Sequence, residues 1–366
     1  MQSQLFSPFQ IGQLTLPNRI VIAPMCQYSA QDGMPSDWHL MHLGAMSHSG
    51  AGLLILEATA VEARGRISPL DLGIWSDAHR DALKDLVQRL RQYSSMPLAI
   101  QLAHAGRKAS SAAPWNGGQL LSADQGGWQT VAPSAIPHYA HDAAPHALTL
   151  DDIQEVRQAF TQGARRALEA GFDSIELHAA HGYLLHQFMS PLSNQRTDQY
   201  GGSLENRLRL TLEIFDDMKQ VLPANYPLGI RISASDWAEG GWDLDSSLAL
   251  TRELEKRGCA FIHVSSGGLA AHQNIPLEPG YQVPFAKAIK AITTMPVIAV
   301  GLITEAKQAE QILQEQEADL IGVARVMLYN PHWPWHAAAE LGAGIHAPRQ
   351  YWRSQPREVK NLFIGM

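Results

Sequence analysis

Two histidines and a tyrosine within six residues could do chemistry together. The segment His178-Ala179-Ala180-His181-Gly182-Tyr183 follows an apolar, strand-like run at residues 174–177. Residues three apart in a strand point to opposite faces, so the two imidazoles converge only if the extended backbone stops near Ala179. Gly182 suits such a turn. Two imidazoles can donate hydrogen bonds to a carbonyl oxygen while a nearby phenol supplies a proton. The alternative is two unrelated histidines, one in the core and one at the surface.

The composition limits what kind of protein carries this segment. The chain has 366 residues, 45% of them hydrophobic, and a formal net charge of -7. It lacks the basic footprint of a protein that binds nucleic acid or an anionic membrane surface. No apolar run reaches the roughly 18 residues of a membrane span, and the N-terminus has no signal-like core. With only Cys26 and Cys259, a cytoplasmic location is expected.

Short apolar runs alternate with helical stretches along the chain, which is typical of a parallel sheet. Eight such runs, each followed by a helix, predict an α/β fold of the (β/α)8 TIM-barrel class in a single domain over residues 1–366. A doubly wound open sheet is the second choice. The expected strands are residues 20–25, 52–59, 97–104, 174–178, 227–233, 261–265, 296–301 and 319–324.

Three segments depart from this alternation. Residues 5–18 predict an N-terminal hairpin that acts as a lid. Residues 105–147, after the third strand, are rich in Gly, Ala, Ser, Pro and Trp and too poor in periodic apolar residues for a core of their own. We interpret them as a capping excursion. Residues 342–366 form a C-terminal extension.

Barrel enzymes place their chemistry at the carboxyl ends of the strands. Gln101 could pair with a pyrimidine edge, and Arg231 could bind an anion on the same ring. Residues near the last two strand ends could hold a phosphate, namely Gly301, Ala324 and Arg325. Taken singly, each residue has an ordinary structural explanation, such as a buried ion pair for Arg231.

Several familiar motifs are missing from the sequence. There is no P-loop, and no G-x-G-x-x-G lies between a strand and a helix, so no Rossmann-type site is indicated. The two cysteines cannot hold zinc or an iron–sulfur cluster. No carboxylate or third histidine accompanies His178 and His181 within their motif, so no metal site is expected.

Four segments together resemble the old yellow enzymes, a family of flavin-dependent ene-reductases, and among them the bacterial xenobiotic reductases. The similarity runs from Leu5 to about Trp352. Its most specific part is the loop of residues 194–207, Asn-Gln-Arg-Thr-Asp-Gln-Tyr-Gly-Gly-Ser-Leu-Glu-Asn-Arg. The others are Pro24-Met25-Cys26-Gln27-Tyr28, residues 101–108 and the segment from His178 to Tyr183.

The resemblance implies noncovalently bound FMN across the barrel mouth. Gln101 and Arg231 would hold its pyrimidine side, and the backbone of Pro24, Met25 and Ala60 would line the ring. Cys26 would tune the reduction potential. The phosphate would lie at Gly301, Ala324 and Arg325, although many relatives have glycine in place of Ala324.

The resemblance also implies a ping-pong reaction in which NADPH or NADH reduces the flavin and an α,β-unsaturated carbonyl compound reoxidises it. His178 and His181 would bind the carbonyl oxygen, and Tyr183 would donate the proton. Tyr28 would help to seat this small-molecule substrate. Nitro compounds and nitrate esters are further candidates. In the subgroup a neighbouring subunit reaches the active site, which makes Trp352 and Arg353 candidate substrate-binding residues and a homodimer or larger oligomer the expected assembly.

Three rival functions remain open on the sequence. A dienoyl-CoA reductase would need an iron–sulfur cluster, for which the cysteines are too few. A flavin-independent hydrolase or aldolase barrel would need a carboxylate-rich ligand set or a lysine at a strand end, and neither is expected here. A catalytically silent flavin-binding module conflicts with the complete set of His178, His181 and Tyr183.

Overall fold

Eight parallel strands form a closed barrel in the structure, a computed structural model that describes residues 3–365. The strands follow one another around the barrel in chain order, and β12 pairs with β3 to close it. Every residue in them is buried, as expected for a parallel sheet covered on its outer face. The (β/α)8 barrel is therefore confirmed. The strands are β3 (Ile20–Ile22), β4 (Leu53–Ala60), β5 (Leu98–Ala103), β8 (Ser174–Ala179), β9 (Leu228–Ser233), β10 (Ile262–Ser265), β11 (Val297–Val300) and β12 (Leu320–Val323).

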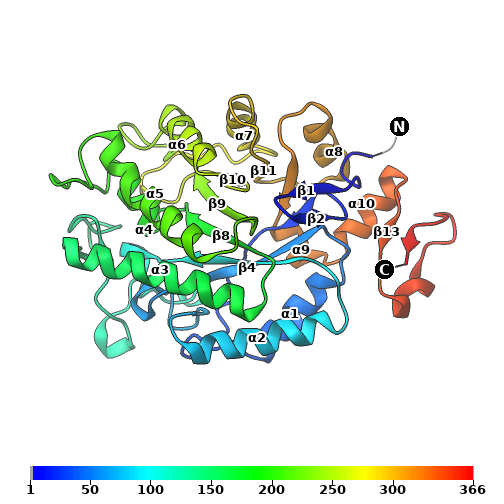
Figure 1. The fold of residues 1–366 in the computed structure, drawn as a ribbon, viewed down its shortest axis with the longest axis horizontal. Helices are drawn as coiled ribbons and strands as arrows, with labels where there is room; N and C mark the ends of the chain where they lie inside the picture. The colour runs from blue at the N-terminus through cyan, green and yellow to red at the C-terminus, as the bar shows by residue number, and fades with distance from the viewer. Residues whose placement is uncertain (1–2, 366) are drawn as a thin grey trace.

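Helices cover the outside of the barrel (Figure 1). The expected caps are present: Thr149 accepts a hydrogen bond from the Asp152 amide, and Gly171 ends the same helix at φ +92°. Ser203 is the N-cap of the helix that begins at Leu204, within the segment of residues 194–207. The helices are α1 (Asp37–Ser47), α2 (Asp77–Arg91), α3 (Leu150–Ala170), α5 (Leu204–Val221), α6 (Leu244–Lys256), α7 (Val283–Lys290), α8 (Ala306–Gln314) and α10 (Trp333–Leu341).

The predicted N-terminal hairpin consists of β1 (Phe9–Ile11) and β2 (Leu14–Leu16), paired antiparallel. Its Ile11 and Leu16 side chains join an apolar cluster with residues at the beginnings of the barrel strands, including Leu53, Phe261 and Leu320. The hairpin therefore closes the amino-terminal end of the barrel, opposite to the end where the chemistry is expected.

The capping excursion, residues 105–147, contains three short 3₁₀ helices and one parallel pair of two-residue strands, β6 (Val131–Ala132) and β7 (His146–Ala147). Two short helices were not expected. Residues after Tyr183 form α4 (Leu184–Met189), entirely buried, where the sequence suggested a loop. The other is α9 (Arg325–Tyr329).

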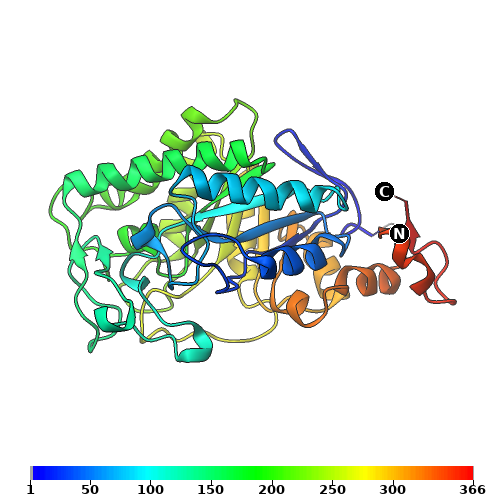
Figure 2. The same ribbon diagram turned by 90° about the horizontal axis from the view of Figure 1, so that it is seen from below.

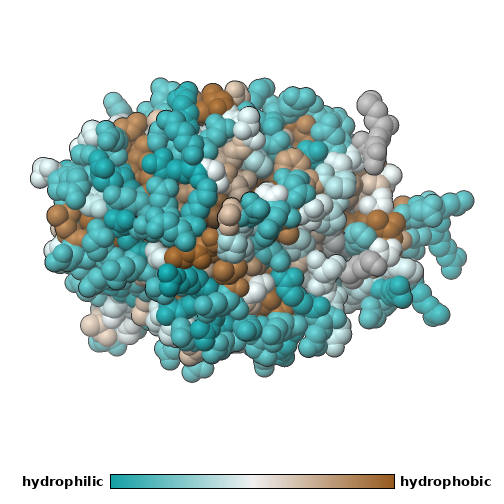
Figure 3. Space-filling model, in the orientation of Figure 1, coloured by the Kyte–Doolittle hydropathy of each residue, from teal (hydrophilic) through white to brown (hydrophobic). Residues whose placement is uncertain are grey.

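The C-terminal extension lies at the same end of the molecule as the hairpin, away from the excursion (Figures 1 and 2). It contains β13 (Ile345–His346), paired with β14 (Phe363–Ile364). The face shown in Figure 3 is mostly hydrophilic, with hydrophobic residues in separate groups. None of the helices within residues 3–365 is long and apolar enough to cross a membrane.

Candidate active site

A layer of polar side chains crosses the barrel interior below its mouth. Gln101 donates a hydrogen bond to Glu176 Oε1 at 2.7 Å, and His263 Nδ1 lies 2.7 Å from Glu176 Oε2. Arg231 on β9 pairs in register with both His178 and His263. Burial lowers the pKa of Arg231, while the charge of Glu176 opposes this effect. A carboxylate thus balances one buried guanidinium at the centre of the barrel.

Arg231 has an unsatisfied donor. Its Nε is buried and has no hydrogen-bond partner among the residues that the structure describes. A buried guanidinium N–H without an acceptor is costly, and native proteins rarely leave one. An anionic or carbonyl group of a ligand at the mouth would satisfy it, which fits the pyrimidine side of FMN.

The three predicted phosphate residues share a cavity with Arg231. This cavity, of about 190 Å³, is lined by Gly301, Ala324 and Arg325 together with Arg231 and Gln282. Gly301 has φ +120°, and a Cβ there would approach Gln282 Nε2 to 2.4 Å. Only glycine suits this position. The cavity has a guanidinium on its inner side and another on its exposed side, so it fits a phosphorylated ligand.

The segment after β3 lies at the same end of the barrel. Residues 24–29 are partly exposed although β3 itself is buried. Burial, together with the charges of Asp71 and Glu57, raises the pKa of Cys26 well above the usual thiol value, so its thiol stays neutral. Tyr28 has φ +49° and meets the Trp115 ring edge-on at 5.6 Å. Ala60 is buried at the end of β4.

His178, His181 and Tyr183 converge as the sequence predicted. The strand β8 ends at Ala179, and the next turn has φ +58° at His181 and φ +72° at Gly182. The His178 ring is perpendicular to both other rings, with centroids 5.2 Å from His181 and 5.0 Å from Tyr183. A single left-handed turn therefore gathers side chains that a continuous strand would separate.

Burial keeps these three groups uncharged. Burial and then the charge of Arg231 lower the pKa of both histidines well below the usual value. His178 Nδ1 accepts the Ala180 amide at 3.2 Å, which leaves the proton on Nε2. His181 Nε2 lies 2.8 Å from Ser265 Oγ. Burial also raises the pKa of Tyr183 well above the ordinary phenol value, so this residue can act as a proton donor.

Lys108 is a residue of the mouth that the sequence analysis missed. Its Nζ donates to the carbonyl oxygens of His181 and Gly268, both at 2.8 Å, and lies 5.1 Å from the centre of the Tyr183 ring. Burial and then the charge of Arg107 lower its pKa to about 8. Lys108 is not itself at a strand end, because β5 ends at Ala103 and Lys108 lies in the 3₁₀ helix Gly106–Lys108. Its position shortly after the end of β5 was the signal that could have identified it as a residue of the mouth.

A second cavity lies between the mouth and the excursion. It has a volume of about 300 Å³ and contacts Tyr28, Lys108 and Tyr183 on one side. Residues of the excursion form the other side, among them Pro114 and Tyr139. The excursion therefore covers the two tyrosines and leaves room for a small molecule beside them.

Trp352 and Arg353 do not reach this mouth in their own chain. They lie in a 3₁₀ helix of the C-terminal extension, where the Trp352 indole donates to Ala347 O at 3.0 Å. The extension packs beside Gly50, before the start of β4 and so near the amino end of the barrel. Their role in a neighbouring subunit's site stays a prediction.

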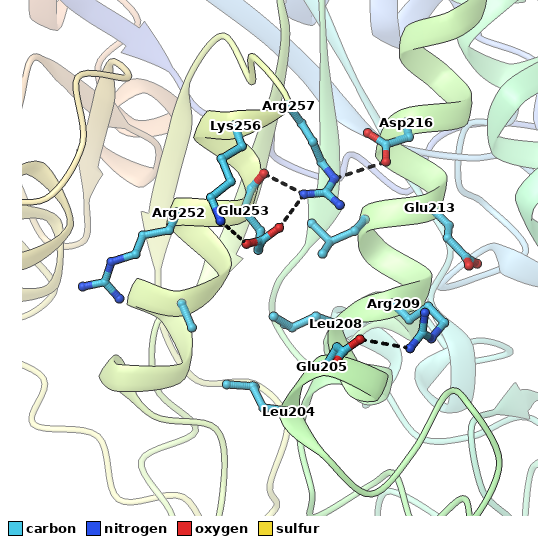
Figure 4. Close-up of a pocket in the computed structure, with 12 residues that line it drawn as sticks. Leu204, Glu205, Leu208, Arg209, Glu213, Asp216, Arg252, Glu253, Lys256 and Arg257 are labelled. Atoms are coloured by element: carbon cyan, nitrogen blue, oxygen red, sulfur yellow. Dashed lines mark hydrogen bonds and ion pairs between the residues drawn. The ribbon is translucent and has the colours of Figure 1, made fainter.

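Another groove, of about 620 Å³, lies between α5 and α6 (Figure 4). Charged side chains dominate it: Arg257 contacts both Glu253 and Asp216, and Lys256 contacts Glu253. None of the predicted cofactor or substrate residues lines it. Since these charges are already paired within the groove, it belongs to the solvated outer layer of the barrel.

Among the described residues no group of three or more His, Cys, Asp or Glu side chains is placed to hold a metal ion. The chemistry of the mouth instead combines neutral imidazoles, a phenol, a buried guanidinium and a cavity suited to phosphate. Comparison with known proteins agrees with this set. The model of the NADH:flavin oxidoreductase / NADH oxidase family matches residues 4–343.

This chain belongs to the NADH:flavin oxidoreductase family, that of the old yellow enzymes. An NADPH dehydrogenase of Halalkalibacterium halodurans is 47% identical over 97% of this chain and 99% of its own length. An NADH:flavin oxidoreductase of Gibberella zeae is 43% identical over 95% of this chain and 88% of its own. The solved structure of morphinone reductase is 29% identical with a TM-score of 0.75, covering 100% of this chain and 97% of its own.

Membership makes the protein an NAD(P)H-dependent flavin oxidoreductase with FMN as its cofactor. The unsatisfied Arg231 Nε and the cavity at Gly301 are the features of this chain that fit FMN. The flavin-independent hydrolase or aldolase reading is thereby overturned. Although Lys108 lies in the mouth, its ammonium is held by two carbonyl oxygens.

Proposed function

We propose that this flavin oxidoreductase reduces the activated C=C bond of α,β-unsaturated carbonyl compounds. The observation that carries the proposal is the turn after β8, which brings two neutral imidazoles and a protonated phenol within about 5 Å, ring centre to ring centre. Neutral imidazole N–H groups can bind a carbonyl oxygen, and their hydrogen bonds strengthen as negative charge develops on it.

Each residue of the mouth has a separate task in this proposal. His178 and His181 bind the substrate carbonyl and draw electron density from the conjugated alkene. FMN held in the mouth would supply the hydride for the β-carbon, with NADPH or NADH as the source of its electrons. Tyr183 gives its proton to the α-carbon, and Tyr28 holds the substrate in the cavity beneath the excursion.

The same geometry supports the cofactor-binding residues that the family resemblance implies. Arg231 and Gln101 would hold the pyrimidine side, and the Gln101 amide is itself oriented by Glu176. The backbone of Pro24, Met25 and Ala60 would line the ring, with the neutral thiol of Cys26 beside it. Gly301, Ala324 and Arg325 would bind the phosphate.

An anaerobic visible spectrum tests the function in one cuvette. The purified protein is expected to show a flavin spectrum that bleaches with NADPH or NADH and returns when cyclohexenone is added. Bleaching without return would contradict the ene-reductase assignment while leaving the flavin oxidoreductase in place. The same assay with a nitroalkene or a nitrate ester then ranks the substrate classes.

We also propose that two or more chains assemble so that Trp352 and Arg353 reach a neighbouring subunit's substrate cavity. Both residues are exposed in the isolated chain, and the C-terminal extension that contains them lies at the opposite end of the molecule from the excursion (Figure 2). Light scattering should give a mass of at least two chains. Trp352→Ala is expected to raise the KM for cyclohexenone severalfold without loss of FMN, whereas a monomeric mass would contradict this arrangement.

A further inference from the structure

The turn that carries His181 and Tyr183 has an unfavourable backbone conformation. His181 is a non-glycine residue at φ +58°, in the left-handed region where side chains crowd the backbone. Such a conformation is unfavourable for a residue with a side chain and persists only where neighbouring groups hold it. Gly182 cannot be replaced either, since a Cβ there would come within 2.2 Å of Gly268 O.

Side chains from other segments hold the backbone of this turn. Ser233 Oγ accepts the His181 amide at 2.9 Å, and Lys108 binds the His181 carbonyl. Gln187 Nε2 donates to Gly182 O at 2.7 Å. The remaining amide, that of Gly182, donates to His186 Nδ1 at 2.9 Å. The Gly182 amide lies between the two residues whose side chains face the substrate.

His186 is itself fixed by a buried carboxylate. Its ring is fully buried on α4, and its Nε2 lies 2.8 Å from Asp236 Oδ1. The second carboxylate oxygen accepts the Ser190 hydroxyl at 2.6 Å and the Trp242 amide at 2.8 Å. Burial opposes ionisation of Asp236, but the contact with His186 and these hydrogen bonds outweigh it and lower its pKa. Asp236 is therefore an anion.

The tautomer of His186 follows from its two partners. Nδ1 accepts a hydrogen bond, so the proton resides on Nε2, the nitrogen in close contact with Asp236 Oδ1, although this contact lies outside hydrogen-bond geometry. A carboxylate behind an imidazole fixes the ring orientation and makes the opposite nitrogen a stronger acceptor. Here the opposite nitrogen holds a backbone amide of the catalytic turn rather than a metal or a hydroxyl.

We propose that His186 and Asp236 form a positioning pair that sets the orientation of His181 and Tyr183 for proton delivery. The inference rests on the ene-reductase activity proposed above. Since a displacement of about 1 Å at a reacting group can cost roughly 10²-fold in rate, loss of this support should slow the step that uses Tyr183. Flavin reduction by NADPH does not need the tyrosine proton and should change less.

Three substitutions at His186 separate the contributions of its two ring nitrogens. The side-chain oxygen of Asn can occupy the place of Nδ1, whereas the amide of Gln reaches the place of Nε2. Phe keeps the planar ring and removes both polar contacts. His186→Asn therefore retains the acceptor for Gly182 and loses the Asp236 contact, His186→Gln does the reverse, and His186→Phe loses both.

The experiment measures both half-reactions by anaerobic stopped-flow on FMN-loaded enzymes. We expect His186→Phe to slow reoxidation by saturating cyclohexenone about 100-fold and flavin reduction less than fivefold. His186→Asn should recover most of the loss, and His186→Gln little of it. Asp236→Asn, which turns an amide N–H toward the imidazole N–H, should give an intermediate loss.

Unfolding temperatures of the same samples separate positioning from scaffolding. The proposal is overturned if reoxidation rates rank with unfolding temperature instead of with the acceptor at the δ position. It is also overturned if both half-reactions slow equally. Should His186→Phe fail to fold, the Asn and Gln variants decide. Failure of the wild-type enzyme to reduce cyclohexenone would instead refute the ene-reductase activity.

Discussion

The two ends of the barrel bury different kinds of side chain. At the amino end, the hairpin and the strand beginnings form a cluster of apolar side chains, with Ile11, Leu16 and Phe261 almost fully buried. At the carboxyl end, Glu176, His178 and Arg231 are buried as well, and His181 is partly buried. Burial alone therefore does not distinguish the ends, but the chemistry of what is buried does.

The closed end therefore adds to the stability of the fold, whereas the mouth lowers it. Apolar burial at the closed end contributes favourably at about 25 cal/mol per Å². The mouth buries charge and strained backbone, including an unpaired Arg231 N–H and a left-handed His181. Such features are tolerated where a ligand will use them. Substitutions at the two ends test this division.

Phe261→Ala tests whether the closed end serves stability alone. Removing this fully buried ring should lower the free energy of unfolding by about 3–5 kcal/mol. Urea denaturation of the FMN-loaded protein measures the loss, and Phe261→Leu is the milder control. Turnover by the folded enzyme at 25 °C should stay within twofold. A tenfold drop in turnover would show that the two ends are coupled.

Tyr183→Phe is the matching test at the mouth. Loss of the proton donor should slow reoxidation by an enone by about 10²-fold or more, while flavin reduction by NADPH stays nearly intact. The unfolding free energy should hardly change, because only a hydroxyl is removed. Stopped-flow traces of the separate half-reactions give both rates. Equal losses in the two would contradict the assignment of Tyr183 as proton donor.

Asp71→Asn tests how much unfolding free energy the protein loses by burying an ionisable carboxyl group near the mouth. Burial, with a contribution from the charge of Glu57, raises the pKa of this carboxyl to about 7, although hydrogen bonds from Ser68 and Ile67 oppose the shift. A carboxyl group whose pKa is raised in the folded state stabilises the protein at pH values below its unfolded pKa, near 3.8. The protein loses this stabilisation as the pH rises from there through the folded pKa of about 7.

We therefore expect the wild-type protein to lose roughly 3–4 kcal/mol of unfolding free energy between about pH 4 and pH 7 through this group. The Asn variant should show a flatter pH dependence over the same range. Denaturation at a series of pH values measures both slopes. Identical slopes would mean that Asp71 ionises in the folded protein as it does in the unfolded chain.

Cys26→Ala should give the smallest effect. FMN is expected to stay bound, with a midpoint potential shifted by about 30 mV, equivalent to roughly 1.4 kcal/mol for a two-electron couple. A redox titration against a reference dye measures the shift, and Cys259→Ala, distant from the mouth in a buried site beside Phe261, is the control. An unchanged potential would remove the tuning role of Cys26.

Part of the site could be predicted because it depends on local sequence. The strand ends followed from apolar runs, and the break near Ala179 followed from the need for two imidazoles to meet. Glu176 could have been found as well, since it lies two residues before His178 on the same face of the strand. The Gly171 and Thr149 caps are likewise local, because a helix end takes its partners from adjacent residues.

Other features depend on residues far apart in the chain. Asp236 lies 50 positions after His186, and no spacing rule connects them. Lys108 follows β5 by five residues, yet it binds the backbone of the β8 turn and of Gly268. The α4 helix was missed because six residues, all of them buried, are too few to show helical periodicity.

Periodicity, turn residues and side-chain chemistry are local properties, so the barrel, the N-terminal hairpin and the candidate reactive groups could be predicted from the sequence. The shared cavity of Arg231, Gly301 and Arg325, and the contacts from several segments that hold the strained His181 turn, could be seen only in the folded chain. Closure of the barrel is the physical reason: it brings the ends of all eight strands to one rim, whatever their separation in the chain.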